Sequence, residues 1–203
     1  NNTKLDINHY FPAEKSRETA NSTTIFQLLT HTSGLKKFGS ETKLSFSNKK
    51  GEYLYSNCGF GILGRIIESV SETTYSDFIK NNIFDKLGMN NSVVGINEAI
   101  KKTVNVSLID SYMNIFGFYK KLDKEDIIED AFMTPAGYLI ISEDDMLEYL
   151  KTFIKRDKIG NDTIIDRMLN NRVNISKDDT ITYGLGIMIN KYKVKDNTYT
   201  IIT

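Results

Sequence analysis

The stretch GEYLYSNCGFGILGRIIE, residues 51 to 68, begins with a Tyr-Ser-Asn tripeptide and continues as an amphipathic helix. Apolar residues recur in it at spacings of three and four, which indicates a single buried face. The predicted face consists of Phe60, Leu63, Ile66, Ile67 and Val70. Gly61 and Gly64 interrupt this pattern, and each costs about 1 kcal/mol relative to alanine in a helix interior. We therefore expect another backbone, or a site, to approach the helix closely at the two glycines.

The composition is that of a globular protein with balanced charge. The chain has 203 residues, of which 40% are hydrophobic, and its 26 basic residues equal its 26 acidic residues in number. This length is enough for one substantial core, so we expect a single domain over residues 1–203. A chain without net charge has no overall field for nucleic acid or an anionic membrane, and we expect a small or neutral partner. No apolar run approaches the roughly 18 residues of a membrane-spanning helix.

Cysteine and histidine are too scarce for a disulfide or a metal site. Cys58 is the only cysteine, and we expect it to be a small buried residue. His9 and His31 are the only histidines, and no spacing of histidine with carboxylates predicts a metal ligand set. We expect no cofactor. Both histidines are predicted to be structural, with packing and the helix dipole sufficient to explain His31 at a helix end.

The first half of the chain predicts three helices. TTIFQLLTHTSGL, residues 23 to 35, indicates a helix capped by Ser22 or Thr23 and closed by Gly34 in a left-handed conformation. The second helix covers about 58–70. Thr73 or Thr74 should cap a third, YSDFIKNNIF, which ends before Leu87-Gly88. Signals over 93–130 are weak, with strand fragments near 104–108 and a charged helix near 124–130.

The second half is clearer. Ser142 followed by three acidic residues predicts the start of a helix. Its predicted buried stripe consists of Met146, Leu147, Leu150, Phe153 and Ile154. A further helix is expected near 163–171. The last 22 residues predict two strands joined as a hairpin at 195–197.

Four segments carry a resemblance to a known family. They are HTSGL (31–35), YSN (55–57), PAGYLIIS (135–142) and YGLGIMI (183–189). Their order and spacing resemble the serine β-lactamase and penicillin-binding-protein family, in the branch of class C β-lactamases, D-alanyl-D-alanine peptidases and esterases. LDINHYFP (5–12) and LGM (87–89) also resemble family segments. The resemblance implies an α+β, β-lactamase/transpeptidase-like fold, here mainly its helical lobe plus a C-terminal strand pair.

The resemblance implies that Tyr55 is a catalytic residue and that Asn57 contacts the substrate. A phenol with an ordinary pKa near 10 can shuttle protons if a nearby cation lowers that pKa. A carboxamide can both donate to and accept from an amide substrate. Gly61 and Gly64 would then let this helix press against the helix that carries the nucleophile. The alternative is that Tyr55 packs and Asn57 merely caps the helix.

The nucleophile is not found in the chain. The family uses a serine and a lysine in an S-x-x-K helix, and three such pairs occur here, at Ser33, Ser40 and Ser47. Chance alone gives one or two matches in this composition, and all three lie in a polar loop rather than on a buried helix. We therefore expect an incomplete domain that lacks the S-x-x-K helix and the final K-[ST]-G or H-x-G strand region.

The resemblance implies a serine hydrolase that forms an acyl-enzyme with β-lactams, D-alanyl peptides or related amides and esters. The intact protein is expected to be an enzyme and this chain alone to be inactive. The alternatives are a non-catalytic penicillin-binding sensor, a helical interaction module, or an esterase acting on ordinary acyl esters. By analogy with the family, an extracytoplasmic location is expected, with a tether through a segment absent here.

Overall fold

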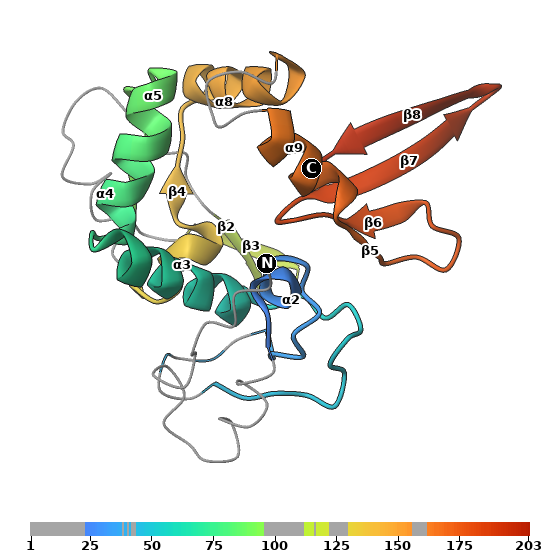
Figure 1. Cartoon of the computed structure of the whole chain (residues 1–203), viewed down its shortest axis with the longest axis horizontal. Helices are drawn as coiled ribbons and strands as arrows, with labels where there is room; N and C mark the ends of the chain where they lie inside the picture. The colour runs from blue at the N-terminus through green and yellow to red at the C-terminus, as the bar shows by residue number, and fades with distance from the viewer. Residues whose placement is uncertain are drawn as a thin grey trace.

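The computed structural model describes residues 23–95 except 38, 40, 42 and 43, residues 112–121 except 116, and residues 130–155 and 162–203. Helices make up one side of the molecule, and the last strands extend from it as a long hairpin (Figure 1). The predicted strand at 104–108 and most of the predicted helix at 124–130 lie outside the described residues, as do His9 and the segment 5–12.

Helix α2 (Ile25–Leu29) is shorter than expected. Thr24 caps it through a reciprocal pair of bonds: the Gln27 amide donates to Thr24 Oγ1 (3.2 Å) and the Thr24 amide donates to Gln27 Oε1 (3.1 Å). The prediction of Ser22 or Thr23 as the cap was therefore wrong. Gly34 has the predicted left-handed backbone (φ 78°), but the helix has already ended, and His31 is left-handed (φ 57°) directly after it.

Helix α3 (Asn57–Ser71) is the central helix, and its buried face is rotated from the predicted one. The buried residues are Cys58, Gly59, Gly61, Ile62, Gly64 and Ile66. Val70 is 72% exposed, and Phe60, Leu63 and Ile67 are only partly buried. The face with the glycines is buried because small residues allow the closest approach of neighbouring backbone.

Helix α7 (Thr134–Gly137) is the element that approaches α3 at its glycines. A Cβ on Gly61 would lie 2.6 Å from the Phe132 carbonyl oxygen, and one on Gly64 would overlap the Pro135 ring. The predicted close approach is thus confirmed. Its partner is the segment at 132–135, not a helix with a nucleophile.

The next helical stretch is continuous from Tyr75 to Leu87. It comprises α4 (Tyr75–Ile79), one π-helical turn (Lys80–Phe84) and α5 (Asp85–Leu87), so it runs three residues beyond the segment expected. Thr74 caps it as predicted, and Gly88 (φ 73°) ends it. Strand β1 (Val93–Val94) follows and pairs antiparallel with β4 (Leu139–Ile140).

Helix α8 (Glu143–Lys155) starts as predicted, with the Asp145 amide donating to Ser142 Oγ (3.3 Å). Its predicted buried stripe is wrong: Leu147 is 53% exposed and Ile154 is 82% exposed. The buried positions are Asp145 and Thr152. Asp145 accepts hydrogen bonds from the Asn91 amide (2.8 Å) and from Ser92 Oγ (2.7 Å), which turns this side of the helix inward.

Helix α9 (Asp162–Asn170) confirms the helix expected near 163–171. The strands after it form a four-stranded antiparallel sheet in the order β5, β6, β7, β8. They are β5 (Val173–Asn174), β6 (Ile181–Tyr183), β7 (Met188–Val194) and β8 (Asn197–Ile202). The predicted terminal hairpin is confirmed as β7 and β8, with Val194 opposite Asn197. A separate hairpin, β2 (Tyr112–Ile115) and β3 (Phe118–Lys121), was not predicted.

Helices of sufficient length and apolarity to cross a membrane do not occur within the described ranges.

Candidate active site at the start of helix α3

Ser56 builds the corner that carries Tyr55 and Asn57. It is the N-cap of α3, where its hydroxyl oxygen accepts from the Gly59 amide (3.2 Å) and its proton is donated to the Lys36 carbonyl (2.9 Å). Its side chain is fully buried. The alternative role of Asn57 as the helix cap is therefore wrong, because Ser56 performs it. A serine directly before a segment with periodic apolar residues is an N-cap signal, so the role of Ser56 could have been predicted from the sequence.

The corner holds Tyr55 and Asn57 at the surface. Tyr55 is 41% exposed and Asn57 is half-buried, while the Asn57 amide donates to the Lys37 carbonyl (3.1 Å). The Lys37 ammonium lies 5.7 Å from the centroid of the Tyr55 ring. Within the described part of the chain, neither the Tyr55 hydroxyl nor the Asn57 carboxamide makes a hydrogen bond. Both groups can therefore bind a ligand without first giving up a partner.

His31 lies beneath Tyr55, buried to 1% exposure. The two ring centroids are 4.4 Å apart, and Phe60 (5.1 Å), Tyr183 (4.8 Å) and Tyr53 (5.9 Å) complete the ring contacts of the imidazole. Burial lowers the His31 pKa from 6.5 to about 4. A structural role in packing is thus supported, but the helix-dipole argument was wrong, because a neutral imidazole carries no charge for the dipole to stabilise.

Two hydrogen bonds tie His31 to distant parts of the chain. The Ser56 amide donates to His31 Nδ1 (3.1 Å), and His31 Nε2 lies 3.2 Å from the Tyr183 hydroxyl on β6. Burial, followed by the nearby Tyr53 and Tyr55, raises the pKa of Tyr183 to about 12, so this phenol stays protonated at neutral pH. Local sequence patterns do not predict this link, because its two partners are 152 positions apart.

All four motif segments meet at helix α3. HTSGL lies under its first turn through His31, and PAGY packs on its glycine face through Pro135. The turn after β6 lies beside the same end: the Gly186 amide donates to the Leu29 carbonyl at the end of α2 (3.1 Å), and a Cβ on Gly186 would lie 3.8 Å from the Phe60 ring of α3. The candidate site therefore lies where the helices meet the sheet (Figure 1).

The S-x-x-K pairs that the structure describes do not form a nucleophile site. Ser33 and Ser47 lie outside the helices: Ser33 Oγ accepts from the Leu35 amide (3.3 Å), and Ser47 Oγ donates to the Gly34 carbonyl (3.1 Å). The Ser40 pair lies outside the described residues. Cys58 is buried, as predicted, and burial raises the pKa of its thiol to about 11, so it is not a reactive thiolate. No metal-binding group of three or more suitable side chains occurs within the described ranges.

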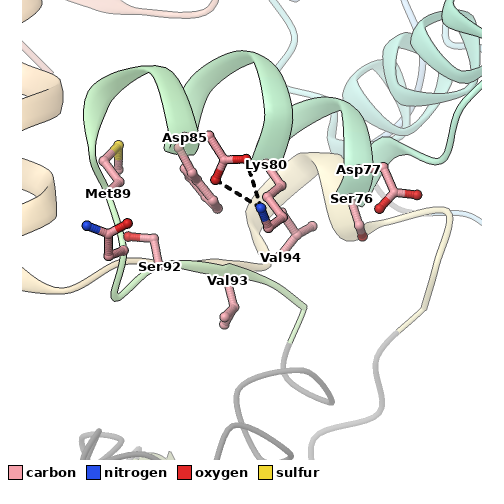
Figure 2. A pocket seen from close by; sticks show the side chains of 10 residues that line it. Ser76, Asp77, Lys80, Asp85, Met89, Ser92, Val93 and Val94 are labelled. Carbon is pink, nitrogen blue, oxygen red and sulfur yellow. Dashed lines mark hydrogen bonds and ion pairs between the residues drawn. The ribbon is translucent and has the colours of Figure 1, made fainter.

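A cavity of about 510 Å³ lies elsewhere, between the α4–α5 stretch and β1 (Figure 2). Among its charged lining residues, Lys80 pairs with Asp85 at 2.8 Å, and the Asp77 carboxylate accepts from Thr74 Oγ1. Ser92, also in its wall, donates its hydroxyl proton to buried Asp145. This lining offers no activated nucleophile and no acid–base pair, so the corner at Tyr55 remains the candidate site.

Comparisons with known proteins agree with the motif pattern. A family model described as Beta-lactamase matches residues 3–201. No curated protein sequence matches the chain. Among solved structures, the chain is similar to an octameric penicillin-binding protein homologue from Pyrococcus abyssi, with 26% identity and a TM-score of 0.65 over 84% of this chain and 44% of the other.

Two further structures show the same fold. A D-amino acid amidase from Ochrobactrum anthropi SV3, complexed with L-phenylalanine amide, has 19% identity and a TM-score of 0.67 over 96% of this chain and 60% of the other. A class C beta-lactamase has 18% identity and a TM-score of 0.69 over 95% of this chain and 54% of the other. The chain thus spans roughly half the length of these proteins.

Proposed function

The chain belongs to the beta-lactamase family, and we propose that it supplies Tyr55 and Asn57 to the acyl-transfer site of a serine hydrolase. Its substrates would be β-lactams, D-alanyl peptides or related amides and esters. The observation that supports this most is the corner itself, where buried Ser56 sets an exposed phenol and a half-buried carboxamide two residues apart. The similar amidase and beta-lactamase structures, named for activities on amide bonds, agree with this substrate class.

In the proposed reaction, a serine Oγ attacks the substrate carbonyl and the bond to the leaving nitrogen breaks. As the serine hydroxyl transfers its proton to the Tyr55 oxygen, the phenol transfers its own proton to that nitrogen, so Tyr55 ends the step as a phenol and no net proton is gained or lost. The Lys37 ammonium, 5.7 Å from the centroid of the Tyr55 ring, places a cation beside the proposed proton-transfer group. The Asn57 carboxamide would donate to a carbonyl oxygen of the substrate or accept from one of its N–H groups.

We further propose that residues 1–203 are part of one domain whose S-x-x-K helix and final K-[ST]-G or H-x-G strand lie outside this sequence. The partial coverage of the similar structures supports this, as do the exposed apolar side chains of α8 and of the terminal hairpin. An extracytoplasmic location is proposed with it, by analogy with the family alone. No cofactor takes part in the proposed chemistry.

A fluorescent penicillin tests the proposal. It should label the full-length gene product covalently, at a serine outside residues 1–203, and should not label the 203-residue chain. Labelling of neither protein would contradict the acyl-transfer proposal and favour a binding or interaction module. Turnover of a chromogenic ester without penicillin labelling would instead identify an esterase.

Replacement of Tyr55 tests the residue assignment. In the full-length protein, Tyr55→Phe should slow acylation by about 10²-fold, since it removes the proton-transfer group. The melting temperature should change little, because the Tyr55 hydroxyl has no partner among the described residues. Tyr192→Phe on strand β7, whose ring is 50% exposed, is the matched control and should acylate at the parent rate. An unchanged rate in Tyr55→Phe would remove this residue from the mechanism.

A further inference from the structure

His31 touches both the corner with Tyr55 and the sheet. Its ring lies against that of Tyr55, with the centroids 4.4 Å apart and the planes tilted by 43°, accepts from the Ser56 amide and reaches Tyr183 on β6. At 1% exposure it cannot meet a substrate. Any effect that it has on catalysis must therefore act through the residues that it holds.

The hydrogen bonds of His31 define one tautomer. A backbone N–H can only donate, so the Nδ1 atom facing the Ser56 amide carries no proton. The single proton of the neutral ring is then on Nε2 and is donated to the Tyr183 oxygen. A protonated ring would place a second donor against the Ser56 amide, and a flipped ring would misplace both groups. The arrangement needs a group with one acceptor and one donor at these two positions.

The backbone conformation at position 31 further limits which residue types fit there. His31 has φ 57°, a left-handed conformation that asparagine, aspartate and histidine adopt more readily than other residues with a side chain. The Leu54 amide donates to the His31 carbonyl (2.7 Å), which fixes this turn against the segment that leads to Tyr55. Asparagine would suit the backbone and accept from Ser56, but its shorter side chain would not reach Tyr183.

We propose that His31 is a positioning residue for Tyr55 and Asn57, orienting their corner relative to strand β6 through a fixed neutral Nε2–H tautomer. The importance of this positioning for acyl transfer rests on the proposed function. The orientation of the corner by His31 does not depend on the proposed function. Tyr183 is part of the same arrangement, since the Tyr183 hydroxyl is the group through which the sheet is joined to the corner.

Nuclear magnetic resonance of the 203-residue chain tests the orientation without any activity. The His31 ring should show a protonated Nε2 and an unprotonated Nδ1 at pH 7. Tyr183→Phe, which removes one oxygen from a buried ring, should shift the ring resonances of Tyr55 and the amide resonances of Ser56 and Asn57. Tyr192→Phe, on the exposed part of β7, is the control and should leave them in place. An Nδ1–H tautomer, or unmoved resonances at the corner in Tyr183→Phe, would overturn the inference.

The acylation rate of the full-length protein tests whether this positioning matters for acyl transfer. Tyr183→Phe and His31→Asn should lower the rate constant of acylation by roughly tenfold while the penicillin concentration at half-saturation stays the same. His31→Gln, whose longer side chain can again donate toward Tyr183, should recover part of the loss. Normal acylation by folded His31→Asn and Tyr183→Phe proteins, with Tyr55→Phe still slow, would overturn the inference but leave the proposed function intact. A parent protein that is never acylated would refute the proposed function, and the resonance experiment would still decide the orientation.

Discussion

A buried imidazole that must remain neutral makes the stability of this fold depend on pH at the scale of a single residue. The His31 pKa is about 4 in the fold and near 6.5 in the unfolded chain, so the unfolded chain binds more protons between these values. Stability from this group is fully present above pH 6.5 and is lost as the pH falls toward 4. The free energy of unfolding should drop by about 2–3 kcal/mol between pH 7.5 and pH 4.5 on this account.

Urea unfolding at several pH values measures that slope. His31→Gln is the control: it lowers stability at pH 7.5 but lacks the titrating group, so its curve should be shallower by the contribution of His31. The carboxylates common to both proteins cancel in the comparison. Parallel curves for the parent and the variant would contradict the prediction.

At the level of single residues, the sequence predicts the corner formed by Tyr55, Ser56 and Asn57 better than it predicts His31, which holds that corner in place. Tyr55, Ser56 and Asn57 are adjacent, and a helix start beside them is legible from local periodicity. The role of His31 could not be predicted, because its partners Ser56 and Tyr183 are distant in the chain. A ring held by two such hydrogen bonds leaves no local sequence pattern. The fold creates that part of the site.

At the scale of elements, the glycines of α3 decide which face is buried. Alanine at position 64 would place a methyl group inside the Pro135 ring of α7. Its higher helix propensity offsets only about 1 kcal/mol, whereas overpacking costs up to about 3 kcal/mol and would force α7 away. We expect Gly64→Ala to lower the free energy of unfolding by up to about 2 kcal/mol.

The matched control is Gly137→Ala in α7, where an added Cβ meets nothing within 4 Å. This change should be neutral or slightly stabilising, by up to about 1 kcal/mol, because it restricts the unfolded chain. Thermal or chemical unfolding of the two variants measures the difference. Equal effects at the two positions would show that helix propensity, not the contact with Pro135, determines the result.

Elements were predicted well where caps and periodicity are local. The start of α8 at Ser142, the cap at Thr74 and the terminal hairpin follow from such signals. The buried faces of α3 and α8 were wrong for one shared reason. Periodicity identifies an apolar face, but the contacts of Gly64 and Asp145 with other elements determine which face turns inward.

At the scale of the whole molecule, apolar side chains remain uncovered on α8 and on the terminal hairpin. Leu147, Leu150 and Ile154 are at least half exposed, and so are Val194 and Tyr199 on the hairpin, which extends away from the helices (Figure 1). Exposed apolar surface of this kind promotes association. The sequence alone could not show this, since the same stripe on α8 is also the pattern of a helix buried in a core.

The double change Leu150→Glu and Ile154→Lys tests whether α8 is uncovered in the 203-residue chain. Leu150 is 50% exposed and Ile154 is 82% exposed, so polar replacements remove little burial and should alter the free energy of unfolding by no more than about 0.5 kcal/mol. They lie four positions apart on the helix, where the new charges attract each other. Sedimentation should show less self-association than in the parent chain. As a control, Ile62→Glu on the buried face of α3 should unfold the chain, because Ile62 has no exposed surface. Severe destabilisation by the α8 double change would mean that this face is covered within the chain itself.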